Sequence, residues 1–206
     1  MRTVRIIMAD WILEPPMPSL RWLSLPSPLL TPGTALLATV APLVAQAATY
    51  ATAEDVAHRA FSGATSVHEV LVTPTPADAA ALTAPGAAPH AGPVRTLEVR
   101  QGDTLLGRVL VDAVVGKFEQ IDYAVAVDPA GKVLAVEILS YRESHGSEVR
   151  LPAWRQQFVG KTAADPIRVG ADIQNISGAT LSCTHVTDGV HRLVAWAAKA
   201  PFGAKP

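Results

Sequence analysis

A short polar stretch near the C-terminus carries the residues best suited to chemistry. Positions 177–180 read Ser-Gly-Ala-Thr and run directly into a helical pattern, whose apolar positions are Val186, Val190, Leu193 and Val194. Ser177 is expected to cap this helix, which leaves backbone N–H groups at the helix start free to bind a phosphate. Gly178 can adopt a positive φ and, with Ala179, leaves room for a large ligand. Thr180 would place a hydroxyl in that phosphate site.

A second copy of the same tetrapeptide occurs at positions 62–65. The residues after Thr65 alternate between polar and apolar types, which predicts a strand rather than a helix. The copy at Thr65 therefore lacks the helix start that binds phosphate, and we expect the functional copy to be the one that ends at Thr180.

A polar loop between a predicted strand and a short helix holds Glu143, His145 and Glu148. Loops of this kind often carry function, and a solvated turn is the alternative interpretation. His185 and His191 are six residues apart, which is not the spacing of two metal ligands on one helix face, so we expect no metal site. The single cysteine, Cys183, cannot form an internal disulfide and is expected to pack in the core of the last helix.

The order of the predicted elements indicates an α+β fold with a small antiparallel sheet flanked by helices. A capping box at Thr52 opens a helix that ends near Phe61, and a strand follows from Val67 to Thr73. Pro74 to Pro93 is expected to be a surface loop, or a linker that contains a weak helix at 77–82. The remaining elements are three strands at 105–115, 119–128 and 132–141, a helix at 151–160, and the C-terminal helix after the Ser177–Thr180 turn. Because no strand–helix–strand alternation occurs, the class is α+β.

The composition and the N-terminus indicate an exported protein without a nucleic-acid partner. The chain has 206 residues and a net charge of −1, so there is no basic excess for nucleic acid. No charged residue lies between Arg21 and Glu54, and Ala45-Gln46-Ala47 resembles a signal-peptidase site. Pro32, Gly33 and Pro42 interrupt the apolar run, which favours a signal peptide over a membrane anchor. Met17 is a second candidate start residue.

Several stretches extend the Ser-Gly-Ala-Thr motif into a family resemblance. They are Gly116-Lys117, 123–133, 141–144 and 157–161, and they occur in this order before Thr180. Together they resemble the FMN-binding domain family, which occurs in periplasmic flavin subunits of sodium-pumping NADH:quinone reductases and Rnf-type complexes, and in smaller exported flavoproteins. The similarity runs from about Gly107 to Trp196.

The resemblance implies a site and a chemistry. FMN would be joined to Thr180 through a phosphoester, installed by a flavin transferase that uses FAD. Ser177, Gly178 and Ala179 would surround the attachment point, and the loop with Glu143, His145 and Gly146 would lie against the flavin. In the large complexes a Thr-Pro-Gly-Leu-Gly run follows the Glu, whereas this chain has Ser-His-Gly-Ser-Glu, which argues against membership of a sodium pump.

The sequence therefore predicts an exported electron carrier rather than a stand-alone enzyme, in the periplasm or otherwise outside the cytoplasm. Its expected partners are the flavin transferase and redox proteins, including membrane-bound ones. The alternative is an exported binding or sensory module of the same fold without flavin. The predicted organisation is a signal peptide or anchor at 1–47, an N-terminal helix, strand and linker at 48–104, an FMN-binding domain at 105–200 and a tail at 201–206.

Overall fold

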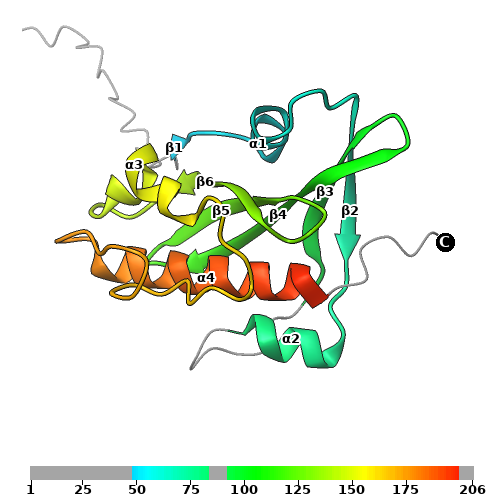
Figure 1. Ribbon diagram of the computed structural model, residues 1–206. Coiled ribbons are helices and arrows are strands. Elements are labelled where there is room, and N and C mark those ends of the chain that lie inside the picture. The colour runs from blue at the N-terminus through cyan, green and yellow to red at the C-terminus, as the bar shows by residue number, and fades with distance from the viewer. Residues whose placement is uncertain (1–47, 84–91, 200–206) are drawn as a thin grey trace, which may run out of the picture. The chain divides into compact units, whose positions relative to one another are not determined.

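An antiparallel sheet lies at the centre of the computed structural model, which describes residues 48–83 and 92–199 (Figure 1). Its strand order is β1-β6-β5-β4-β3-β2. The strands are β1 (Ala48–Thr49), β2 (Ser66–Val72), β3 (Val94–Gln101), β4 (Thr104–Val115), β5 (Gln120–Val127) and β6 (Val133–Tyr141). The predicted α+β class and the antiparallel pairing of the three strands after residue 104 are confirmed.

Four helices accompany the sheet: α1 (Ala53–Ala60), α2 (Pro76–Leu82), α3 (Pro152–Arg155) and α4 (Thr180–Lys199). The capping box predicted at Thr52 is present, because its hydroxyl accepts from Asp55 N at 3.1 Å and the Asp55 carboxylate accepts from Thr52 N at 2.9 Å. The single helix expected over 151–160 is instead α3 followed by a 3₁₀ turn, Gln156–Phe158. A second 3₁₀ turn, Ser147–Arg150, precedes α3.

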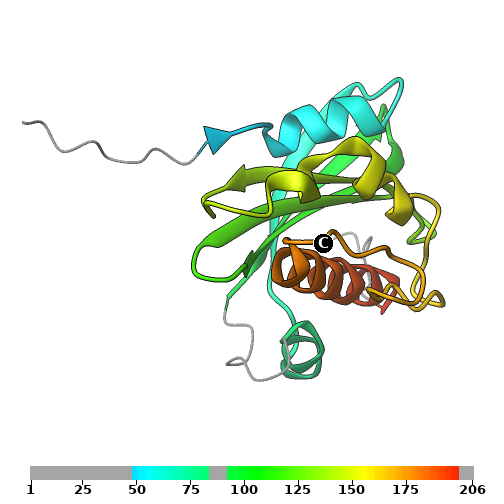
Figure 2. The same cartoon turned by 90° about the vertical axis from the view of Figure 1, so that its left-hand side faces the viewer.

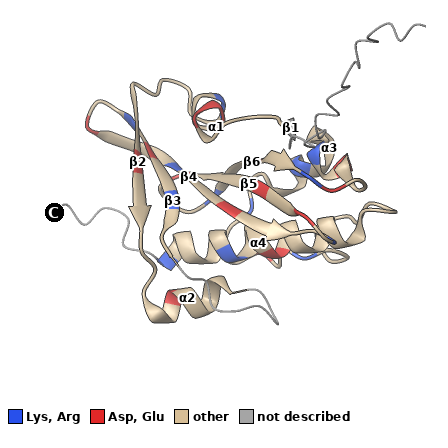
Figure 3. Cartoon of the chain, turned by 180° about the vertical axis from the view of Figure 1, so that it is seen from behind, with Lys and Arg blue, Asp and Glu red and all other residues tan. Residues whose placement is uncertain are grey.

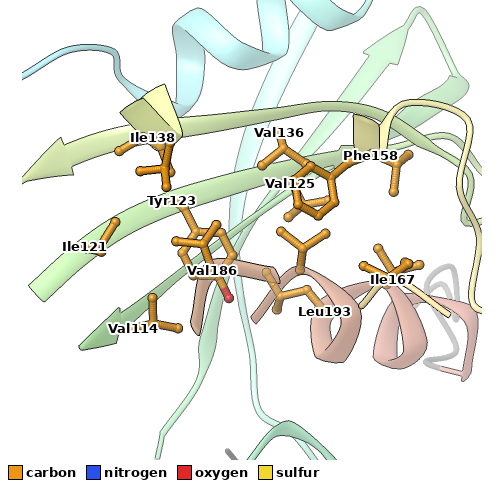
Figure 4. Close-up of a cluster of buried hydrophobic side chains, with 14 of the residues drawn as sticks. Val114, Ile121, Tyr123, Val125, Val136, Ile138, Phe158, Ile167, Val186 and Leu193 are labelled. Atoms are coloured by element: carbon orange, nitrogen blue, oxygen red, sulfur yellow. The ribbon is translucent and has the colours of Figure 1, made fainter. Parts of the chain in front are cut away.

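The two faces of the sheet are covered by different helices, with α1 on one side and α4 on the other (Figure 2). Strand β5 explains the arrangement, since its side chains alternate between the faces. Ile121, Tyr123 and Val125 belong to the core cluster under α4, whereas Ala124 and Ala126 belong to the cluster under α1. The small alanines leave room for α1. The larger residues fill the space between the sheet and α4 (Figure 4).

The apolar face predicted for the last helix is the buried face of α4. Its fully buried members are Cys183, Val186, Val190, Leu193 and Val194. Burying a Val or Leu side chain stabilises a fold by about 1.5–3 kcal/mol, so this face anchors α4 firmly on the sheet. The position of Thr180, the first residue of α4, is therefore fixed by packing further along the helix.

Strand β3 was not predicted from the sequence. It lies between β2 and β4, with Leu97 opposite Val109 on β4 and opposite Glu69 on β2. Arg95, Glu98 and Arg100 alternate with its apolar residues, and this weakens the apolar signal. Consequently β2 and β3, which precede the segment predicted to bind FMN, form part of the same sheet.

Some of the sequence predictions lie outside the described residues. These are the signal peptide or anchor at 1–47, the centre of the 74–93 loop at 84–91 and the C-terminal tail at 201–206. By its internal contacts the chain divides into 1–43 and 44–206, and every described residue belongs to the second unit. Within 48–83 and 92–199, no helix has the length and apolar character needed to cross a membrane.

Acidic and basic residues are interspersed along the strands and helices (Figure 3). Glu137 on β6 illustrates how they join elements: its carboxylate lies 2.6 Å from Arg155 on α3 and 3.2 Å from Arg59 on α1. This pairing connects both α1 and α3 to the strand that leads into the candidate site.

Candidate functional site

A pocket of about 610 Å³ lies at the N-terminal end of α4. Three segments that are distant in sequence form it: the turn between β4 and β5, the loop after β6, and the start of α4. Its lining residues are Lys117, Phe118, Glu143, Ser144, His145, Gly178, Ala179, Thr180, Leu181 and Ser182. The volume is within the range of about 300–1,000 Å³ that is typical of small-molecule sites.

The helix start differs from the predicted one. Ser177 is not the cap of α4, because Ser177 and Gly178 form a turn in which Ala179 N donates to Ile176 O at 3.0 Å, and α4 begins at Thr180. Gly178 has a φ of 85°, which a right-handed helix cannot contain, so the helix can start only after it. The N–H groups without a partner inside the helix are therefore those of Thr180, Leu181 and Ser182.

Thr180 is exposed and faces the pocket. Its hydroxyl oxygen accepts a hydrogen bond from Asn175 Nδ2 at 3.1 Å, which orients the side chain. A Cβ built on Gly178 would meet nothing within 4 Å, so the space beside Thr180 is open. Ala179 is 3% exposed and forms part of the pocket wall. Ser177 is exposed and does not line the pocket.

Glu143 holds the opposite wall in place. Its Oε1 accepts hydrogen bonds from Phe118 N at 2.6 Å and Glu119 N at 2.9 Å. Partial burial raises the pKa of the Glu143 carboxyl, but the backbone N–H groups of Glu119, Phe118 and Lys117 lower it further, and the pKa lies below its usual value. The carboxylate is thus occupied in fixing the β4–β5 turn.

Tyr141 connects the loop after β6 to α4. Its hydroxyl donates to His145 O at 2.5 Å and lies 3.0 Å from Ser182 Oγ. Burial raises the pKa of Tyr141, so the hydroxyl remains protonated well above neutral pH. A Cβ built on Gly146 would lie 2.8 Å from the Tyr141 hydroxyl and 3.2 Å from Ala179 Cβ. Gly146 therefore permits the loop to pack against the start of α4.

Five of the predicted site residues line the pocket, and two, Gly146 and Ser177, do not. Gly178, Ala179 and Thr180 line the pocket from α4 and the turn before it, and Glu143 and His145 line it from the loop. The side chain of His145 is exposed, and its Nδ1 lies 2.9 Å from Ser144 Oγ. Gly146 packs behind the pocket wall, and Ser177 lies apart from the pocket.

Asp172 shapes the chain that leads to Thr180. Its carboxylate accepts from Lys161 Nζ at 2.8 Å, Arg168 N at 2.8 Å and Ile167 N at 3.1 Å. Although burial raises its pKa, these hydrogen bonds lower the pKa of Asp172 below its usual value. Ile167 is buried with a φ of 39°, a strained conformation for a β-branched residue that the Asp172 contacts maintain.

Comparisons with known proteins identify this region. The family model of the FMN-binding domain matches residues 116–195. Residues 116–195 are therefore similar to FMN-binding domains. The matched residues include every residue that lines the pocket. Among solved structures, NqrC of Shewanella oneidensis is similar with a TM-score of 0.45 and 18% identity, over 73% of this chain and 77% of that one. No curated protein sequence matches the chain.

The residues present fit FMN. The helix start offers the N–H groups of residues 180–182 to a phosphate, and the macrodipole of α4 favours negative charge there. The open space at Gly178 accommodates a bulky group beside Thr180. Phe118 and Leu181 add exposed apolar surface to the same pocket, as a flavin ring requires.

Five residues that line the pocket were not assigned to the site from the sequence: Lys117, Phe118, Ser144, Leu181 and Ser182. Phe118 is the clearest case, since it is 75% exposed and follows Gly-Lys in a turn. In the sequence, an aromatic residue within a short polar turn was the feature that could have indicated this role. His185 also acts here, because its Nδ1 lies 2.6 Å from Val115 O and 3.0 Å from Gly116 O and ties the turn to α4.

The second Ser-Gly-Ala-Thr copy has a different environment. It precedes strand β2, as predicted, and Thr65 accepts from Gly102 N at 2.9 Å while its hydroxyl donates to Arg100 O at 3.3 Å. Thr65 therefore connects the chain to the β3–β4 turn and does not line the pocket that Thr180 faces. Among the described residues, no group of three His, Cys, Asp or Glu is arranged to hold a metal ion.

Proposed function

We propose that this protein is an exported electron-transfer flavoprotein that carries FMN covalently on Thr180. The observation that carries the proposal is the position of the Thr180 hydroxyl, exposed at the first residue of α4 and facing a pocket of about 610 Å³ within the FMN-binding domain. Bound FMN would supply the capacity to accept and release electrons. The chain itself supplies attachment, orientation and the electrostatic environment.

The attachment step requires a nucleophile and a phosphate site, and both occur at the start of α4. A flavin transferase would use FAD as the donor. A bond would form between Thr180 Oγ and the phosphorus of the FMN half, and the pyrophosphate bond would break. AMP would leave, and overall it takes up the proton of the Thr180 hydroxyl. The N–H groups of residues 180–182 would then hold the phosphate oxygens. Asn175 already orients the hydroxyl at 3.1 Å.

Export is the second part of the proposal. The uncharged apolar run that ends at Ala45-Gln46-Ala47 supports a cleaved signal, and a covalent tether keeps the cofactor with a protein outside the cytoplasm. Redox partners would then be periplasmic or membrane-bound. N-terminal sequencing of the exported protein should give a first residue close to Ala48. An intact N-terminus on a membrane-bound product would replace the signal with an anchor.

The attachment is tested by co-expressing the full chain with a flavin transferase and measuring intact mass. We expect the wild type to gain the mass of FMN minus water, Thr180→Val to gain nothing, and the yellow colour of the wild type to survive acid precipitation. Thr65→Val is the matched control and should be modified like the wild type. An established substrate of the transferase shows that the enzyme is active. An unmodified wild type under those conditions would favour a flavin-free binding or sensory module.

A further inference from the structure

Phe118 is an exposed aromatic side chain at the candidate site, and its turn is held from two directions. The side chain is 75% exposed, more than any other large apolar residue among those described, and it lines the pocket that Thr180 faces. A ring in this position leaves apolar surface in water, which is unfavourable unless a ligand covers it.

The turn that presents Phe118 is fixed by one backbone hydrogen bond and by the side chains of Glu143 and His185. Gly116 N donates to Glu119 O at 2.8 Å, which closes the turn. Glu143 accepts the Phe118 N–H on one side, and His185 on α4 contacts the Val115 and Gly116 carbonyls on the other. A Cβ built on Gly116 would lie 2.6 Å from Glu143 Oε1, so the glycine permits this approach. The ring is therefore carried on a fixed support.

We propose that Phe118 covers the isoalloxazine ring of FMN attached to Thr180, and that Leu181 extends the same apolar contact. This proposal rests on the proposed function. Both side chains line the pocket with Thr180, and Leu181, which is 46% exposed, follows Thr180 in the first turn of α4. An aromatic side chain and a flavin are both planar, and such rings favour offset stacking. Lys117 Nζ lies 4.8 Å from the centre of the Phe118 ring, which brings a positive charge to the same position.

The test compares Phe118 with an exposed apolar residue far from the pocket. Leu71 on β2 is 61% exposed and does not line it, so Leu71→Ala and Leu71→Trp are matched controls. Full-length proteins are loaded with FMN by the transferase, and loading is verified by intact mass. The measured quantity is the quenching of flavin fluorescence by iodide. Phe118→Ala should raise the quenching constant by about twofold, because one face of the ring loses its cover, whereas Leu71→Ala should leave it unchanged.

A second variant, Phe118→Trp, provides an independent measurement. Phe118→Trp would place an indole against the flavin, and electron transfer from the stacked indole should quench flavin emission several-fold, while Leu71→Trp should not. A loaded protein whose iodide quenching is unaffected by Phe118→Ala and whose emission is unaffected by Phe118→Trp would overturn the inference and leave the attachment at Thr180 intact. A wild type that carries no flavin by mass is the separate result that overturns the proposed function.

Discussion

Removal of the Tyr141 hydroxyl tests how the site is held together. Tyr141 is 4% exposed, and its hydroxyl bonds to His145 O at 2.5 Å and approaches Ser182 Oγ to 3.0 Å. Tyr141→Phe removes both contacts and leaves the His145 carbonyl and the hydroxyl of the buried Ser182 with one partner fewer. Each lost hydrogen bond costs about 1 kcal/mol, so we expect a loss of about 2 kcal/mol in the free energy of unfolding. For a domain of this size that corresponds to a fall in Tm of about 4–8 °C.

Tyr123→Phe is the matched control. Tyr123 is fully buried on the neighbouring strand, and its hydroxyl donates to Asp112 at 3.2 Å, away from the pocket. Both variants should be destabilised in urea unfolding, but only Tyr141→Phe should loosen the loop at His145 and raise iodide quenching of the bound flavin. Equal quenching in the two variants, or an unchanged stability of Tyr141→Phe, would refute the assignment of Tyr141 as the connection between this loop and α4.

Three further predictions concern Glu143 and Gly178, which line the pocket, and Thr65 in the second Ser-Gly-Ala-Thr copy. Because the pKa of Glu143 is lowered in the folded state, its contribution to stability is present above about pH 4.5 and is lost as the pH falls through the folded value. Glu143→Gln should therefore reduce the free energy of unfolding by about 1 kcal/mol at neutral pH, and urea unfolding should show this difference vanishing in acid; a constant difference would contradict the role of the charge. Gly178→Ala should cost about 1 kcal/mol in urea unfolding, since φ is 85° and no atom obstructs the new Cβ, and it should still accept flavin, whereas a loss of more than a few kcal/mol would indicate a hidden clash. Thr65→Val should lower stability slightly through the loss of the Gly102 hydrogen bond, and intact mass should show unchanged flavin incorporation. Loss of flavin from a folded Thr65→Val protein would show that attachment occurs at Thr65 and not at Thr180.

The sequence predicted the elements whose patterns are local. The period of the apolar residues in α4 and the capping box at Thr52 both appear in the structure as expected. Strand β3 was missed because Arg95, Glu98 and Arg100 interrupt its apolar character, and its place depends on pairing with two other strands.

The part of the candidate site that one continuous segment forms was predicted from the sequence. The part that depends on tertiary contacts was missed. The Gly178–Thr180 stretch was assigned from its own residues, although the positive φ of Gly178 shifts the helix start from the expected cap at Ser177. Phe118 was not assigned, because contacts from residues distant in the chain, Glu143 and His185, hold that turn at the pocket. No periodic pattern encodes such a contact.

The most direct test of the account is to locate the flavin on the chain. Wild-type protein co-expressed with the transferase is digested with trypsin, and the flavin-bearing peptide is fragmented in a mass spectrometer. We expect the FMN mass on the peptide from Val169 to Arg192 and, within it, on Thr180. An adduct on Ser177, Ser182, Thr184 or Thr187 of that peptide, or on the peptide that contains Thr65, would contradict it.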